Sequence, residues 1–150
     1  MASRFRLLLS IALGLCVPVV ALAQIATTTT SVTVRAGPDR SMPSVTSLLS
    51  NTSVNVVGCV ANWSWCDVFA GRERGWVSTR YLSVPFEGTA ITIAYGGPRL
   101  GLPVAEFALG PYWDEHYQRR IWFAQKSTWQ RRWDQQRPMS PWRAPAAPSS

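Results

Sequence analysis

The stretch Val32-Thr33-Val34-Arg35-Ala36-Gly37-Pro38 gives the first clear structural signal in this chain of 150 residues. Its first three residues carry β-branched side chains, which favour a short strand that turns alternate side chains to opposite faces. Gly37 and Pro38 then predict a turn, because both residues favour backbone angles that interrupt a strand. Short strands closed by such turns are typical of small all-β domains.

The same alternation of strand-like runs and turns continues to residue 84. Further strands are expected at residues 45–48, 54–56, 65–69 and from 76 onward. A loop is expected over residues 70–75, where Gly71 and Gly75 interrupt the pattern. No 3.6-residue periodicity runs through this part of the chain, so helices are not expected in it.

These residues resemble the bacterial SH3 (SH3b) domain family. The opening stretch looks like the V-x-V-R-x-G-P signature of that family, and Val54-Asn55-Val56-Val57-Gly58-Cys59 fits its second block. Residues 65–82, from Trp65-Cys66 through Gly75-Trp76-Val77 to Tyr81-Leu82, fit the closing block. The three blocks occur in order within residues 32–84. The resemblance implies a small SH3-like barrel over these residues and peptidoglycan, often its peptide stems, as the default ligand class.

Residues 1–23 are predicted to be a secretory signal peptide. The first six residues carry two arginines and no acid, residues 7–20 are almost wholly apolar, and Ala21-Leu22-Ala23 offers small residues at the cleavage site. An uncleaved membrane anchor is the alternative, but the apolar run is shorter than the ~20 residues of a bilayer span. We therefore expect an exported protein. The stretch through residues 97–103 also resembles the C-terminal half of small exported proteobacterial proteins that carry one SH3 domain, which implies export across the inner membrane into the periplasm of a Gram-negative bacterium.

Cys59 and Cys66 remain once Cys16 has left with the signal peptide. An even number of cysteines in an exported chain predicts one disulfide, here between Cys59 and Cys66. Closing so short a loop is worth about 2.5 kcal/mol in the chain-entropy model. Two cysteines and the single, distant His116 cannot fill the four positions of a tetrahedral zinc site, so no metal and no cofactor are expected.

The segments that flank the SH3-like stretch differ in composition. Residues 24–31 read as a Thr-rich lead-in, and residues 85–111 as a linker with a β-hairpin whose strands are expected at 91–95 and 104–109. Residues 138–150, rich in Pro, Ala and Ser, are predicted to be disordered. After the signal and this tail, about 110 residues remain, which suffice for one small domain and an appendage.

Residues 112–137 form a Trp/Arg-rich extension that is predicted to be partly helical. Pro111 favours the first turn of a short helix that runs through Tyr117. Ser127 and Gln130 fit a capping box for a second helix, on which Trp129 and Trp133 would share a face. The complete expectation is an all-β fold: a small SH3-like barrel, an extra β-hairpin and this extension.

Three interpretations of the extension are open. Five of the eight tryptophans lie in residues 112–143, where seven Lys and Arg outnumber three acids to give +4 of the chain's +7 net charge. The aromatic side chains could fold back and complete the core, or they could join the arginines in a surface for an anionic envelope polymer or lipid headgroups. Interleaved aromatic and basic residues also suit nucleic acid, but export makes a nucleic-acid partner the least favoured.

Candidate ligand contacts occur in both parts of the chain. Trp63 lies in the loop that the disulfide closes, and an aromatic side chain on a rigid loop is a good binding anchor. Tyr81 follows the last strand and could line the same surface. Arg35 either contacts ligand or pairs with an acid on the barrel wall, and Trp76 is expected in the core. In the extension the candidates are Trp129, Arg131, Arg132 and Trp133.

No residue pattern in the chain predicts an enzyme. The only histidine is His116, the acids form no pair with catalytic spacing, and neither a nucleophile elbow nor a phosphate loop occurs. The sequence therefore predicts a non-catalytic binding module of the cell envelope that recognises peptidoglycan or another anionic component. A periplasmic protein–protein adaptor and attachment of the tail to anionic lipid are the alternatives.

Overall fold

The computed structural model describes residues 24–136, which are built mostly of strands. The strands are β1 (Gln24–Thr28), β2 (Val32–Arg35), β3 (Ser44–Leu48), β4 (Ser53–Cys59), β5 (Trp65–Ala70), β6 (Glu73–Ser78), β7 (Leu82–Phe86) and β8 (Thr89–Thr92). The α-helices are α1 (Ile93–Gly96), α2 (Leu109–His116) and α3 (Lys126–Gln136), and the 3-10 helices are η1 (Thr79–Tyr81), η2 (Gly97–Leu100) and η3 (Ile121–Gln125). The predicted signal peptide (1–23) and tail (138–150) lie outside the described residues.

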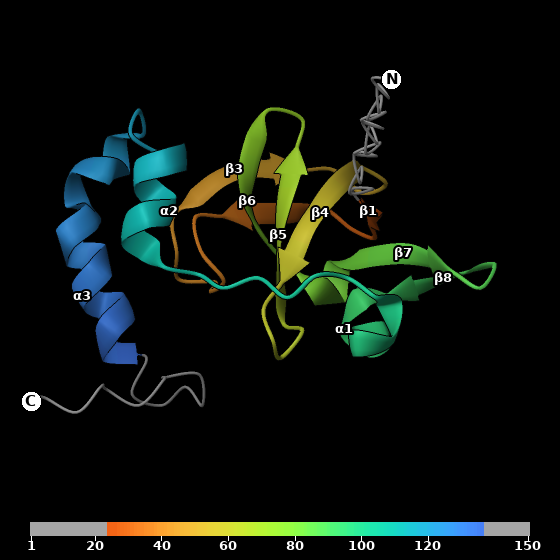
Figure 1. Cartoon of the computed structure of the whole chain (residues 1–150). Helices are drawn as coiled ribbons and strands as arrows, with labels where there is room; N and C mark the ends of the chain where they lie inside the picture. The colour runs from red at the N-terminus through yellow and green to blue at the C-terminus, as the bar shows by residue number, and fades with distance from the viewer. Residues whose placement is uncertain (1–23, 137–150) are drawn as a thin grey trace, which may run out of the picture.

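All eight strands belong to one antiparallel sheet in the order β3-β2-β6-β5-β4-β1-β7-β8. The helices α2 and α3 lie side by side at one end of this sheet, and α1 lies at the other (Figure 1). Strands expected from alternation are present as β2 to β6, which confirms the mainly β prediction. The loop expected at residues 70–75 is shorter than predicted: β6 already begins at Glu73, because Gly71 (φ 61°) allows a tight turn.

The Thr-rich segment is more than a lead-in, since β1 is an interior strand between β4 and β7. Ala26 and Thr28 are fully buried. The hydroxyl of Thr28 donates a hydrogen bond to the carbonyl of Leu49 (2.7 Å) and accepts one from the amide of Thr52 (2.9 Å). A run of Ala and Thr lacks the alternation of apolar and polar residues that predicts a strand. A threonine whose hydroxyl both donates and accepts a hydrogen bond can still be buried at little cost in stability.

The hairpin after the SH3-like stretch is present, but its strands differ from the predicted ones. It pairs β7 with β8 through Glu87 and Gly88, whose φ angles of 49° and 79° are those of a two-residue hairpin turn of type I′. The strand predicted at 91–95 ends at Thr92, where α1 begins and carries Ile93 into the core. Its predicted partner at 104–109 is wrong: Val104 makes only an isolated parallel bridge to Cys59.

The extension completes the core of the sheet. Trp113 lies on α2, and Tyr117 lies about one helical turn later, directly after the helix. Both side chains are almost completely buried. The indole N–H of Trp113 donates to the carbonyl of Ala36 (2.8 Å), and the Tyr117 hydroxyl donates to the carbonyl of Arg74 (2.8 Å). The first of the three interpretations is therefore confirmed for these aromatic residues.

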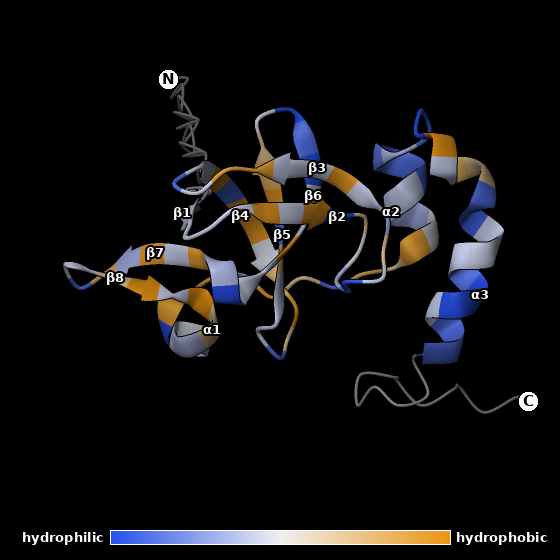
Figure 2. Cartoon of the chain, turned by 180° about the vertical axis from the view of Figure 1, so that it is seen from behind, coloured by the Kyte–Doolittle hydropathy of each residue, from blue (hydrophilic) through white to orange (hydrophobic). Residues whose placement is uncertain are grey.

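The helices of the extension begin earlier than their sequence signals predict. α2 starts at Leu109, ahead of Pro111, and α3 starts at Lys126, so Ser127 lies inside the helix and the capping box is wrong. η3 runs directly into α3, which leaves no free N-terminus for Ser127 to cap. Hydrophobic colours follow the strands and α1, whereas α3 is mostly hydrophilic (Figure 2). Half-buried tryptophans nevertheless hold α3 against the rest of the molecule.

A chain shortened to residues 24–84 should lose cooperative folding. The truncation removes Trp113 and Tyr117, and each buried aromatic lost from a core costs ~3–5 kcal/mol, against ~5–15 kcal/mol for the stability of a typical domain. Guanidinium unfolding followed by circular dichroism should give a sharp transition for residues 24–150 and a broad or absent one for 24–84. Equal midpoints would show that the extension adds nothing to the core.

Candidate functional site

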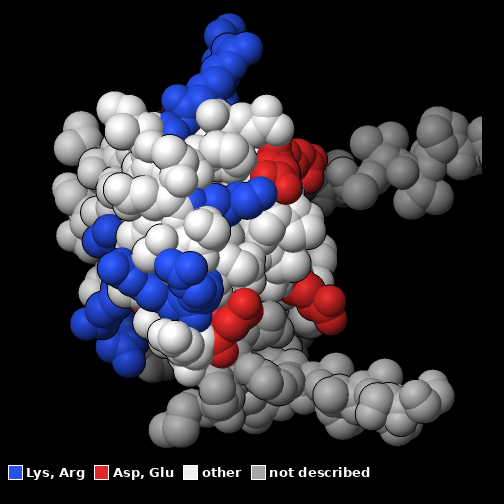
Figure 3. Space-filling view, turned by 90° about the vertical axis from the view of Figure 1, so that its left-hand side faces the viewer, with Lys and Arg blue, Asp and Glu red and all other residues white. Residues whose placement is uncertain are grey.

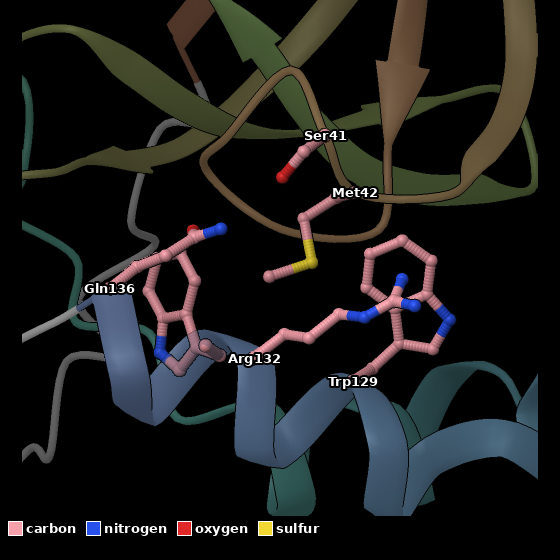
Figure 4. Close-up of a pocket in the computed structure, with 6 residues that line it drawn as sticks. Ser41, Met42, Trp129, Arg132 and Gln136 are labelled. Atoms are coloured by element: carbon pink, nitrogen blue, oxygen red, sulfur yellow. The ribbon is translucent and has the colours of Figure 1, made fainter.

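A pocket lies where α3 passes the loop between β2 and β3. Its volume is about 210 Å³. We call it the seam pocket, and it is lined by Ser41, Met42, Trp129, Arg132, Trp133 and Gln136. In Figure 4, Met42 projects from the loop toward the helix, and Arg132 reaches from the helix toward Trp129. The pocket therefore combines residues that are about 90 positions apart in the sequence.

Two tryptophans fix α3 at the wall of this pocket. Trp129 and Trp133 are one turn apart, so they share a face, as predicted. Trp129 packs against Trp113 with 6.3 Å between ring centroids, and Trp133 meets the ring of Phe107 edge-on at 5.2 Å. Both indoles are half-buried, so part of each remains available to a ligand.

Arg132 supplies the positive charge of the pocket. Its guanidinium lies over the indole of Trp129, 5.2 Å from the ring centroid, and the residue is exposed. It makes no ion pair with any of the residues 24–136. A guanidinium that rests one face on an aromatic ring keeps the N–H donors at its edge for a carboxylate or phosphate.

The surface around α3 carries excess positive charge. Arg120 pairs with Glu73, and Lys126 pairs with Asp114, so these cations are neutralised. Three exposed arginines outside these pairs belong to this part of the chain: Arg119, Arg131 and Arg132. Figure 3, which looks onto this side of the molecule, shows Lys and Arg side chains gathered on it, with acidic side chains near their margin.

A buried polar network holds α2 in place behind α3. The carboxylate of Asp67 on β5, 4% exposed, accepts two hydrogen bonds from Arg74 on β6 (3.0 and 2.8 Å) and one from the hydroxyl of Tyr112 on α2 (2.7 Å). The hydrogen bonds that Arg74 donates to Asp67 raise the pKa of Arg74 above its usual value. Burial raises the pKa of Tyr112 well above its usual value, so the phenol remains a donor over the accessible pH range.

The candidate residues of the SH3-like stretch lie apart from the seam pocket or only support it. Trp63 has a positive φ of 59°, is half-buried and lies over Gly97. Tyr81 is 44% exposed. Arg35 donates to the carbonyl of Met42 (3.2 Å) and makes no ion pair with an acid of residues 24–136, so it steadies the loop that lines the pocket. Trp76 is fully buried, as expected.

The extension supplies most of the pocket that the structure forms. Of its candidates, Trp129, Arg132 and Trp133 line the pocket, whereas the guanidinium of Arg131 lies near the hydroxyl of Thr128 (3.4 Å). Ser41 and Met42 could not be predicted from the sequence, because only the packing of α3 brings their loop to the tryptophans. The disulfide between Cys59 and Cys66 is confirmed; it joins β4 and β5 where these two residues are paired.

The sequence pattern of the first strands can now be compared with known families. Residues 30–83 match the family model of the bacterial SH3 domain. We refer to this matched segment as the SH3 domain. Searches of curated proteins and of solved structures found no match to the chain. The SH3 domain contributes Ser41 and Met42 to the seam pocket, while the other lining residues lie beyond the matched segment.

Two classes of feature are absent from residues 24–136. No group of three or more His, Cys, Asp or Glu side chains in this part of the chain could hold a metal ion. No helix in it has the length and hydropathy that a membrane span requires.

Replacing Tyr112 with Phe should destabilise the protein. Tyr112→Phe removes one of three hydrogen bonds to the buried carboxylate of Asp67, and a lost bond to a charged group costs about 1.5–3 kcal/mol. Urea unfolding of the two proteins measures the difference. Tyr95→Phe is the matched control, because Tyr95 is 83% exposed and should change stability by less than about 0.5 kcal/mol. Equal stability of Tyr112→Phe and the parent would show that the network does not hold α2.

Stability should fall at mildly acidic pH because of His116. Burial first, and Arg74 second, lower the pKa of this imidazole, whose ring lies 4.6 Å from that of Tyr112. Protonation then favours the unfolded chain, so the free energy of unfolding decreases as pH falls below about 6.5, the ordinary histidine value. His116→Gln should remove this part of the dependence in urea unfolding at pH 8 and pH 5.5. Identical pH profiles for the two proteins would contradict this role.

Proposed function

We propose that this protein is an exported, non-catalytic binding module of the bacterial cell envelope, and that it recognises peptidoglycan or another anionic envelope component. The observation that carries the proposal is the position of Arg132. Its guanidinium lies over the indole of Trp129 and has no acidic partner among the described residues. The residue lines a pocket between the SH3 domain and its extension. We further propose that the strands of the SH3 domain close into the SH3-like barrel that the family implies.

The chemistry of the site favours an anionic polymer with apolar faces. Arginine presents a planar fork of donors that matches carboxylate and phosphate. Indole rings pack well against the C–H faces of sugars and against short aliphatic side chains. The remaining exposed arginines near α3 would add a longer-range attraction that depends on salt.

The compartment is part of the same proposal. The predicted signal peptide supports export, and the Cys59–Cys66 disulfide suits an oxidising compartment such as the periplasm. Removal of the predicted signal peptide takes away Arg4 and Arg6, and the net charge of +5 that remains suits the anionic surface of an envelope polymer.

Co-sedimentation of oxidised residues 24–150 with purified sacculi tests the proposal. The double variant Arg131→Gln, Arg132→Gln should bind about tenfold more weakly, which corresponds to about 1.4 kcal/mol. Arg80→Gln with Arg99→Gln is the matched control: it removes the same charge from exposed residues of η1 and η2, which pack against α1 rather than α3. Binding should also weaken as salt rises.

Three results would redirect the proposal. If the parent protein does not sediment with sacculi at low or at physiological salt, recognition of the wall is wrong. If it instead sediments with vesicles of anionic lipid, attachment to lipid through the extension takes its place. If it binds neither, the protein–protein adaptor becomes the leading function, and crosslinking in cells is the next experiment.

A further inference from the structure

The seam pocket is small enough to limit what it can hold. Its volume is about 210 Å³, and it is partly open to solvent. One amino-acid residue or one sugar ring matches a space of this size. The pocket is therefore suited to a single unit of a ligand.

The polar groups around the pocket favour a negative ligand. Arg132 lies over the ring of Trp129 with its donors unused by any described acid. The carboxylate of Asp39, on the same loop as Ser41, accepts hydrogen bonds from the amide (2.7 Å) and hydroxyl (2.5 Å) of Ser41. Gln136 adds an uncharged amide to the lining. Among the six lining residues, Arg132 alone carries a charge.

The apolar groups favour a ligand with a small hydrocarbon part beside its negative charge. Met42 is almost fully buried, so the part of it that reaches the pocket forms a fixed floor rather than a mobile rim. The indoles of Trp129 and Trp133 supply two further apolar surfaces. A methyl group or the C–H face of a ring would cover these surfaces, whereas a free inorganic anion would leave them in contact with water.

We propose that the seam pocket is a subsite for one residue that carries a free carboxylate next to a small apolar group, with the carboxylate held by Arg132 over Trp129. This inference rests on the proposed function for its setting and deepens it by naming the ligand chemistry. The α-carboxylate at the end of a short peptide and the carboxylate of an acidic sugar share this chemistry.

Calorimetric titration of the oxidised 24–150 protein distinguishes the two sources. The probes are acetyl-alanyl-alanine, its C-terminal amide, glucuronic acid, its methyl ester and inorganic phosphate. At least one of the two free carboxylates should bind, and its amide or ester should bind at least tenfold more weakly. Binding of the peptide alone would assign a peptide end, and binding of the sugar acid alone would assign an acidic sugar. The inference would be overturned if the amide or the ester bound as tightly as its free carboxylate, or if phosphate bound more tightly than both carboxylates.

Single variants tie the binding to the pocket. Arg132→Gln should weaken binding at least tenfold, and Arg132→Lys should restore part of it, because lysine keeps the charge but lacks the planar fork. Arg80→Gln is the matched control, since Arg80 is an exposed arginine of η1 outside the lining, and it should leave binding within about twofold. Near-ultraviolet circular dichroism confirms that each variant is folded. Equal losses of binding in Arg80→Gln and Arg132→Gln would overturn the assignment of the carboxylate to Arg132.

The two proposals can fail separately. Sedimentation with sacculi that persists while no carboxylate probe binds would overturn the subsite and leave envelope binding in place. Binding of a carboxylate probe without sedimentation would support the subsite and overturn recognition of the wall.

Discussion

The arrangement of the whole molecule depends on how the buried carboxylate of Asp67 is satisfied. A charge taken out of water must find donors with good geometry, or burying it destabilises the fold. Arg74 supplies two of these donors from the neighbouring strand, and Tyr112 supplies the third from a helix 45 residues away in the sequence. The same network therefore joins the SH3 domain to α2. Through α2 it fixes η3 and α3, and so sets the wall of the seam pocket.

The extension and the SH3 domain are best regarded as one folded unit. The domain contributes the buried Trp76, and the extension adds Trp113 on α2 and Tyr117 directly after it to the buried residues. Gly75 on β6 allows this close approach: a Cβ at this position would lie 2.6 Å from Val34 and 3.2 Å from the Tyr117 hydroxyl. Once these aromatics are buried, the arginines of the extension remain outside. The same segment thus supplies buried aromatic side chains to the core and most of the residues that line the seam pocket.

Strands within residues 32–84 were predictable because alternation and glycine-containing turns are local signals. β1 was missed because Ala26 and Thr28 are buried through backbone pairing and hydroxyl hydrogen bonds, which leave little trace in hydrophobicity. On α3, Trp129 and Trp133 could be assigned to one face from their spacing. Met42, which lines the same pocket, could not be assigned to it, because only the packing of α3 brings its loop to the tryptophans. Local patterns thus predicted the elements and half of the site, while long-range packing determined the other half.

The bond from the Trp113 indole to the carbonyl of Ala36 spans 77 residues, and the one from Arg120 to the carbonyl of Val45 spans 75. Contacts so distant in sequence close large loops, which slows folding. During synthesis, the strands of the SH3 domain emerge long before the helix that completes their interior. For that interval the nascent chain exposes an unfinished apolar surface. A chaperone that shields it until α2 arrives would protect this protein from aggregation and proteolysis.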